Sequence, residues 1–156
     1  MSSCHNHTHC IDDALLSAQQ ICLDKGVKLT ARREQVLRLI WQSHKPLGAY
    51  ALIEMLSELT AKTVAPPTVY RALEFLMELG LIHRINSLNA FLGCPDPKAH
   101  GVQAANYFLI CAQCQDTEEF IDTVIDERIH QHALQQTFKP QQQWLEITGL
   151  CQSCQE

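Results

Sequence analysis

The stretch Pro66-Pro67-Thr68-Val69-Tyr70-Arg71-Ala72-Leu73 decides how the first half of the chain folds. Proline is tolerated in the first turn of a helix, where its missing N–H would have no intrahelical partner, so the proline pair predicts a helix start. Gly80 marks the end of this helix. Residues at helical spacing form one apolar face, which consists of Val69, Ala72, Leu73 and Leu76. The stretch therefore predicts an amphipathic helix whose outer side carries Tyr70, Arg71 and Glu74.

Three further helices and a hairpin are predicted around this stretch. The first helix runs from about Asp12 to Lys25 and follows a flexible arm at residues 1–11. The second begins after Thr30, whose hydroxyl can cap it, and the third follows the turn at 45–48. After the fourth helix, residues 81–85 and 90–94 read as two strands around a turn. Several short helices followed by a two-stranded ribbon predict a winged helix-turn-helix over residues 12–94.

The second half of the chain is predicted to be a smaller domain of strands and one helix. Residues 95–105 begin with a proline- and glycine-containing stretch and are predicted to form a hinge. Strands are expected at Tyr107–Cys111, near Glu118–Phe120 and at Gln143–Thr148. The helix between the last two strands has an apolar stripe of Ile121, Ile125, Ile129 and Ala133. The predicted fold class is α+β, a winged helix-turn-helix followed by a compact α/β domain at residues 106–156.

Four of the eight cysteines form two matched pairs, Cys111-x-x-Cys114 and Cys151-x-x-Cys154. Two thiolates three positions apart can hold one edge of a metal ion, so two such pairs complete a tetrahedral Cys₄ zinc site. The alternatives are a thioredoxin-like redox pair, for which the surrounding βαβ pattern is missing, and two disulfides. Disulfides suit a secreted protein, but the N-terminus lacks the apolar core of a signal peptide. The pairs therefore predict a structural zinc site.

The composition favours a cytoplasmic protein with one local basic face. Hydrophobic residues make up 46% of the chain, and no apolar run approaches the ~20 residues needed to span a bilayer. With many thiols and no targeting segment, the expected location is the reducing cytosol. The net charge is −5, but from Asp24 to Lys45 six basic residues stand against two acidic ones. Such a face can bind phosphate while the rest of the molecule stays acidic.

Tyr70 and Arg71 lie in the first turns of their helix, where helix-turn-helix proteins present residues to the major groove. Arginine can donate two parallel hydrogen bonds to guanine, and tyrosine can contact a phosphate or a thymine methyl group. Cations placed to hold the DNA backbone are Arg32, Arg33 and Arg84. The alternative is that Tyr70 packs against the protein and Arg71 pairs with Glu74 three residues on. These residues alone leave both interpretations open.

Several motifs accumulate along residues 12–154. They are Gly26-Val27-Lys28-Leu29-Thr30-Ala31-Arg32-Arg33, Ala49-Tyr50, Pro66-Pro67-Thr68-Val69-Tyr70-Arg71-Ala72-Leu73, Gly80-Leu81-Ile82 and Gly149-Leu150-Cys151-Gln152-Ser153-Cys154. In these motifs the chain resembles the ferric-uptake-regulator superfamily. The resemblance implies a homodimeric bacterial repressor. Its N-terminal winged helix would bind double-stranded operator DNA, and its C-terminal domain would dimerise and hold a structural Cys₄ zinc. It also implies that Tyr50 and Thr68, which stand in the matching motifs, contact DNA.

The resemblance further implies a sensory metal site with the ligands His83, Cys94, His100 and Glu119. Iron-sensing members carry a His-His-Asp-His run after the wing, and this chain has none. Its Cys/His/His/Glu set resembles the site of zinc-sensing members, and the soft thiolate favours zinc over manganese and Fe(II). Glu118 is a neighbour that can substitute for Glu119. These residues imply two zinc ions per monomer, one structural and one sensory.

A mechanism follows from the position of these ligands along the chain. A metal held by both domains restrains the hinge and selects one spacing of the two recognition helices in a dimer. A symmetric dimer then matches successive turns of a palindromic operator. The expected function is a zinc-responsive transcriptional repressor that binds the operators of zinc-uptake genes when zinc is plentiful.

The N-terminal tract Cys4-His5-Asn6-His7-Thr8-His9-Cys10 is not explained by the resemblance. Its composition is that of a metal-binding string, with the candidate ligands Cys4, His5, His7, His9 and Cys10. Two interpretations stand. The tract is either a third, weaker zinc site that modulates sensing or a tail that captures metal only in vitro.

Three rival functions are less favoured. A regulator of the same superfamily that responds to iron, manganese or peroxide is disfavoured by the missing His-His-Asp-His run and by the thiol of Cys94. A zinc or thiol enzyme needs an open coordination position beside a general base, and four ligands leave neither, so no catalysis and no small-molecule substrate are expected. A zinc-ribbon interaction module without DNA binding explains the cysteine pairs but not the winged-helix half.

Overall fold

The structure is a computed structural model that describes residues 7–100 and 106–155. The chain divides into two compact units, with the boundary between residues 102 and 103. Each unit has its own helices and its own three-stranded sheet. Within the described part of the chain, no helix has both the length and the apolar character that crossing a membrane requires.

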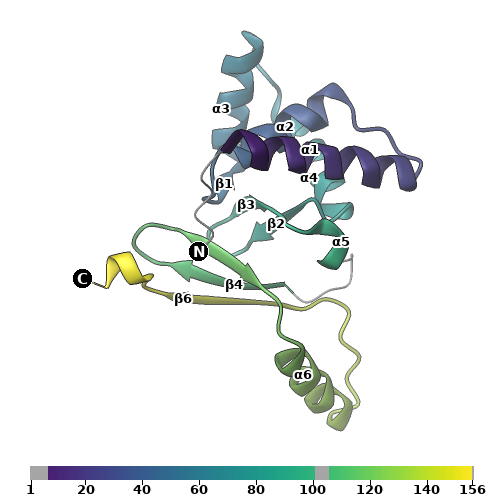
Figure 1. The fold of residues 1–156 in the computed structure, drawn as a ribbon, viewed down its shortest axis with the longest axis vertical. Helices are drawn as coiled ribbons and strands as arrows, with labels where there is room; N and C mark the ends of the chain where they lie inside the picture. Colours follow the sequence, from purple (N-terminus) through teal and green to yellow (C-terminus); the bar gives the residue numbers. More distant parts are fainter. Residues whose placement is uncertain (1–6, 101–105, 156) are drawn as a thin grey trace. The chain divides into compact units, whose positions relative to one another are not determined.

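Four helices make up most of the first unit (Figure 1). They are α1 (His7–Asp24), α2 (Ala31–Trp41), α3 (Ala49–Thr60) and α4 (Pro66–Glu78). α2 begins where predicted because the hydroxyl oxygen of Thr30 accepts a hydrogen bond from the backbone N–H of Arg33, at 3.4 Å. α4 begins at Pro66, in the first-turn position where proline costs no intrahelical hydrogen bond.

The helices of the first unit pack around one apolar core. The amphipathic faces read from the sequence point inward, and the largest of these side chains are less than 2% exposed. They include Leu37, Ile40, Leu52, Leu56, Leu73 and Leu76. The apolar stripe predicted for the fourth helix is therefore confirmed.

A small antiparallel sheet completes the first unit. It consists of β1 (Leu47–Gly48), β2 (Ile82–Ile85) and β3 (Ala90–Gly93), in the order β1-β3-β2. The β2–β3 ribbon sets His83 opposite Leu92 and Arg84 opposite Phe91. Helices α2 to α4 followed by this ribbon form the winged helix-turn-helix that the sequence predicts.

The second unit is a mixed sheet with one long helix. Its strands are β4 (Asn106–Cys111), β5 (Thr117–Phe120) and β6 (Trp144–Gly149), in the order β5-β4-β6. β5 pairs antiparallel with β4, whereas β6 runs parallel to it. Parallel neighbours need a long connection between them, and α6 (Thr123–Gln135) is part of it (Figure 1). The predicted α/β domain is confirmed.

Helix α6 is fixed at its N-terminal end by two sets of hydrogen bonds. The carboxylate of Asp122 caps it by accepting from the backbone N–H groups of Val124 and Ile125, at 2.8 and 3.0 Å. The hydroxyl of Tyr107, on β4, donates to Asp126 in the first turn of the helix. Burial is the largest of the effects that raise the pKa of Tyr107 to about 12, so this donor keeps its proton at neutral pH.

The structure corrects several predicted boundaries. The flexible arm was expected over residues 1–11, but α1 begins at His7, because Ile11 extends the stripe of Leu15 and packs against the core. Ile121 was placed on the apolar stripe of α6, yet it precedes the Asp122 cap and is exposed. Three short elements were missed: β1, the single-turn helix α5 (Pro97–His100) and the 3-10 helix η1 (Gln152–Cys154). None of them is long enough to show a hydrophobic period.

We expect Leu76→Ala to lower the free energy of unfolding by about 2–5 kcal/mol, because it removes a fully buried side chain and leaves a cavity. The matched control is Leu59→Ala, whose side chain on α3 is 57% exposed and which should change stability by no more than about 0.5 kcal/mol. Chemical denaturation followed by circular dichroism measures both. Equal losses for the two variants would contradict the packing described above.

Candidate metal centres and nucleic-acid interface

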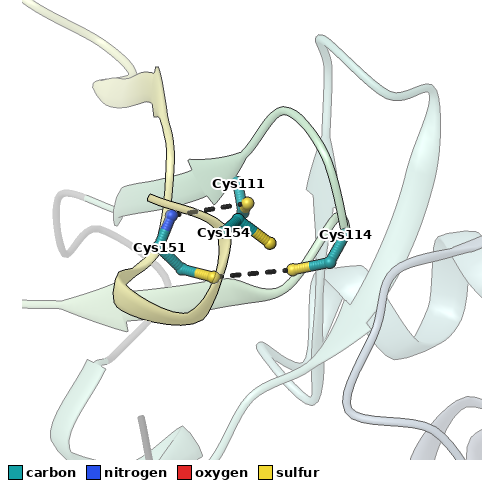
Figure 2. A group of neighbouring side chains, drawn as sticks. All are labelled: Cys111, Cys114, Cys151 and Cys154. Carbon is teal, nitrogen blue, oxygen red and sulfur yellow. Dashed lines mark hydrogen bonds between the residues drawn. The ribbon is translucent and has the colours of Figure 1, made fainter. Parts of the chain in front are cut away.

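The parallel pairing of β4 and β6 brings the two cysteine pairs together. Cys111, the last residue of β4, lies opposite Gly149, the last residue of β6. Cys114 follows in the turn after β4, while Cys151 and Cys154 begin and end the turn around the short helix η1 (Gln152–Cys154). The four side chains point toward one another from these two turns (Figure 2). The sheet register thus assembles the site that the spacing predicts.

The distances between the four sulfur atoms fit a tetrahedral zinc ion. The sulfur atoms of Cys111, Cys114, Cys151 and Cys154 all lie within 4.8 Å of one another. The Sγ atoms of Cys114 and Cys151 are 3.7 Å apart. With Zn–S bonds of about 2.3 Å, a tetrahedron has S–S edges of about 3.8 Å. All four are free thiols, so the structure does not contain the two disulfides that were considered as an alternative.

Backbone hydrogen bonds prepare one of these sulfur atoms as an anion. Hydrogen bonds from the backbone at Cys114 and Cys151 are the main effects that lower the pKa of Cys111 to about 6. The N–H group of Cys151 donates to the Cys111 Sγ at 3.4 Å. Sharing of hydrogen bonds with Cys151, together with burial, raises the pKa of Cys154 to about 12. A divalent cation is the partner that lets all four sulfur atoms lose their protons.

Cys111→Ser or Cys154→Ser should lose the bound zinc and unfold the second unit. A structural zinc contributes roughly 10–16 kcal/mol of apparent binding free energy, more than the net stability of a small domain. Metal analysis of the purified variants and proteolysis of the second unit are the measurements. Cys22→Ala is the control, because this thiol is buried in the core of the first unit, away from the four-cysteine group. A folded Cys111→Ser variant with undiminished zinc would refute the site.

The first unit contributes a separate pair of metal-binding side chains. His83 lies on β2, and Cys94 directly follows β3. The backbone N–H of Cys94 donates to the carbonyl oxygen of Leu81 at 3.0 Å, which continues the pairing of the two strands by one residue. The ligand atoms of His83 and Cys94 lie within 4.8 Å of each other. One imidazole and one thiol so placed can supply half of a tetrahedral zinc site.

The remaining predicted sensory ligands have different positions. Glu119 is on β5 of the second unit, opposite Phe108, and is partly buried. Its neighbour Glu118 lies opposite Leu109 and is exposed. His100 is the last residue of α5, and its side chain lies outside the described part of the structure.

The N-terminal tract is only partly described. Cys4, His5 and the side chain of His7 lie outside the described residues, and the described members are His9, which is exposed, and Cys10, which is partly buried. Within residues 7–100 and 106–155, neither belongs to a cluster of three or more metal-binding side chains. A third metal site in this tract stays a prediction.

The outer side of α4 is open to solvent. Tyr70 is 43% exposed, Arg71 is exposed, and Thr68 is partly buried in the first turn. Tyr50, at the start of α3, is 79% exposed. Among the described residues, no ion pair joins Arg71 to Glu74. The structure therefore does not contain the ion pair between Arg71 and Glu74 that was the alternative interpretation. The guanidinium of Arg71 is available to a ligand.

Three other arginines make contacts within the first unit. The guanidinium of Arg33 lies 3.5 Å from the ring centroid of Phe75 on α4 and donates to the carbonyl oxygen of Lys28 at 2.6 Å. Arg32 donates to Gln35 at 3.2 Å, and Arg84 donates to Asn89 across the turn of the ribbon at 2.8 Å. The sequence predicts that Arg33 holds the DNA backbone, and that role stays a prediction; the structure adds a contact between α2 and α4 through Arg33 and Phe75. No local motif signals a contact between residues so far apart in sequence.

These features define a two-unit metalloprotein in which a winged helix-turn-helix precedes a unit with a four-cysteine site. The model of the Ferric uptake regulator family matches residues 24–148, and the chain belongs to this family. The Zinc uptake regulation protein of Escherichia coli (strain K12) is 33% identical over 146 residues, which cover 92% of this chain and 82% of the relative.

Two solved structures are similar along nearly the whole chain. The crystal structure of holo XcZur is 37% identical with a TM-score of 0.84, and the match covers 93% of this chain and 98% of that one. A zinc uptake regulator complexed with zinc and DNA is 31% identical with a TM-score of 0.86, covering 92% and 94% of the two chains. The similarity thus extends over the winged helix, the ribbon and the four-cysteine unit.

Proposed function

We propose that this chain is a zinc-responsive transcriptional repressor that binds palindromic operators of zinc-uptake genes when it is loaded with zinc. The observation that carries the proposal is the His83–Cys94 pair, because it places metal ligands in the same unit as the exposed side of α4. Similarity to a zinc uptake regulator solved with zinc and DNA supports both activities. As a member of this family, the chain is proposed to be a regulator of transcription in the cytoplasm and not an enzyme.

The sensory zinc site is proposed to consist of His83, Cys94, His100 and Glu119. One thiolate, two imidazoles and one carboxylate suit tetrahedral zinc, and the thiolate disfavours manganese and Fe(II). The first two ligands precede the segment 95–105 along the chain, and Glu119 follows it. A metal bound by all four would restrain that segment, which we propose to be the hinge. The metal-free protein would then occupy the DNA-binding arrangement for a smaller fraction of the time and bind DNA more weakly.

A second zinc is proposed at Cys111, Cys114, Cys151 and Cys154, where it has a structural role. Four thiolates leave no open position for a substrate or a water molecule, as expected for a structural zinc site. This gives two zinc ions per monomer. The tract Cys4–Cys10 is proposed at most as a weaker third site, because ordering a loop around a metal costs conformational entropy.

A homodimer is proposed because the second unit exposes many large apolar side chains. Leu109 on β4 and Ile147 on β6 are paired across the sheet, and both are more than 40% exposed. Others in this unit are Ile121, Val124, Leu134, Phe138, Trp144 and Leu150. Single exposed apolar residues are ordinary, but so many in a small unit favour burial by a second copy. A twofold dimer presents two α4 helices to the two halves of a palindrome.

DNA contacts are proposed from the exposed residues of the helix-turn-helix. Arg71 and Tyr70 would reach base edges, while Tyr50 and Thr68 would contact the backbone or the base edges nearby. Arg32 and Arg84 would contact phosphates. Arg33 would contact a phosphate from its position against the ring of Phe75.

A gel shift with operator DNA across buffered concentrations of zinc, manganese and Fe(II) tests the proposed function. We expect zinc to promote binding at the lowest free concentration. If Fe(II) or manganese did so instead, the chain would be the iron- or manganese-responsive regulator of the same family. If no metal promoted DNA binding, the repressor function would be wrong.

Cys94→Ser should keep the structural zinc but lose the zinc response of DNA binding, because it removes the sensory thiolate without touching the four-cysteine site. Glu119→Ala should act in the same way, whereas its exposed neighbour provides the control Glu118→Ala, which should bind DNA as the unaltered protein does. Metal analysis and gel shifts in buffered zinc separate the two effects. Wild-type zinc dependence in Cys94→Ser would exclude Cys94 from the sensory site.

Arg71→Ala should relax discrimination at one operator position by about 1–3 kcal/mol if Arg71 makes a bidentate contact to a base. A phosphate contact would instead weaken binding to all sequences and lower its salt dependence. The control is Arg33→Ala, which should cost about 0.5–2 kcal/mol of stability through the lost contact with Phe75, with base discrimination unchanged. Competition gel shifts with single-base operator variants measure discrimination. No effect of Arg71→Ala would assign sequence recognition to other residues.

A further inference from the structure

Gly93 approaches Trp41 so closely that no side chain fits between them. A Cβ atom at position 93 would lie 2.4 Å from Cε2, 2.5 Å from Nε1 and 2.9 Å from Cζ2 of the indole. Trp41 is the last residue of α2, and Gly93 is the last residue of β3. The indole therefore lies directly against the bare backbone of the strand. Glycine within a strand often marks such a close approach.

The glycine is needed here for space and not for its conformation. The described glycines with positive φ angles are Gly26 and Gly80, so the backbone of Gly93 is one that alanine can also adopt. Gly48, in the same sheet, has only one neighbour near its missing Cβ, the carbonyl oxygen of Asn89 at the ordinary distance of 3.9 Å. The contact with Trp41 is what distinguishes position 93.

This contact lies one residue before a proposed zinc ligand. Gly93 pairs with Ile82, the residue before His83, and Cys94 follows Gly93 directly. The indole and Cys94 also line the same cavity of about 200 Å³, together with Leu37 and Leu81. A shift of the indole therefore acts on the backbone that carries the thiol and on the space around it. Closely packed protein interiors transmit such small displacements.

We propose that Trp41 is a positioning residue for Cys94, and that its contact with Gly93 joins the sensory zinc site to helix α2. The inference rests on the proposed role of Cys94 as a zinc ligand. Side chains behind a first set of ligands hold them in place, and their mutation costs about 10–100-fold in metal affinity. α2 also contacts the DNA-facing helix through Arg33 and Phe75. Trp41 thus lies at one end, and Arg33 near the other, of a helix that links the metal site to α4.

Trp41 itself provides the first test, because the chain has only two tryptophans. In a Trp144→Phe background, all tryptophan fluorescence comes from Trp41. Zinc is titrated into protein that already holds one equivalent of zinc at the four-cysteine site. We expect the emission of Trp41 to change as the second equivalent binds, and Cys94→Ser to abolish the change. An emission that stays constant while zinc binds at Cys94 would overturn the inference.

The second test compares Gly93→Ala with the control Gly48→Ala. Cobalt(II) serves as the probe, since a thiolate–cobalt absorption band reports binding at Cys94 when the four-cysteine site is filled with zinc. We expect Gly93→Ala to weaken cobalt binding about 10-fold or more, and Gly48→Ala to leave it unchanged. Trp41→Leu alone should also weaken cobalt binding, and its effect should add only partly to that of Gly93→Ala, because both changes disrupt the same contact.

The outcomes separate this inference from the proposed function. If the unaltered protein shows no cobalt band that depends on Cys94, the sensory site is wrong and the role of Trp41 falls with it. If the band forms and Gly93→Ala binds cobalt as tightly as the unaltered protein, only the role of Trp41 is overturned. If Gly93→Ala does not fold, the fluorescence of Trp41 in the Trp144→Phe background decides the question.

Discussion

The parallel pairing of β4 with β6 is the constraint on which the second unit depends. It sets Cys111 opposite Gly149, so that the turns following the two strands bring their cysteine pairs to the same end of the sheet. This unit has few other means of stabilisation. Its buried hydrophobic residues within the described part are Tyr107, Phe108, Ile110, Cys111 and Ala133. Domains with so small a core commonly need a metal, a disulfide or a partner chain. The four-thiol cluster of this unit suits a metal, and its exposed apolar surface suits a partner chain.

The first unit could be predicted well from sequence because its signals are local. Thr30 as a cap, Pro66 at a helix start and the apolar stripe on α4 each act within a few residues, and each lies where it was expected. The start of α1 was missed because His7 and its neighbours are polar, and helix formation there follows from the packing of Ile11 against the core. Isolated turns of helix are unstable, so such tertiary contacts decide where a helix ends.

The candidate sites were also predictable only where their residues form pairs that are close together along the chain. The four cysteines could be grouped from their spacing alone, and the hairpin register explains why His83 and Cys94 lie close together. The parallel direction of β6 and the contact of Arg33 with Phe75 could not be read from sequence. Both depend on residues that are distant along the chain. The sequence predicted Arg71 as a base contact and Arg33 as a backbone contact, but it could not show that Arg33 has an internal partner, Phe75, whereas Arg71 has none among the described residues.

The separation of the two cysteine pairs along the chain also has a consequence during protein synthesis. Cys151 lies 37 residues after Cys114, and α6 and β6 are made between them. At about 5–20 residues per second, the ribosome needs roughly 2–7 s to make that interval. During this time Cys111 and Cys114 can hold a metal ion by only two thiolates. Zinc bound at the proposed four-cysteine site would therefore complete its coordination late, and the second unit would gain that stability only after β6 has been made, while the winged helix can already have folded.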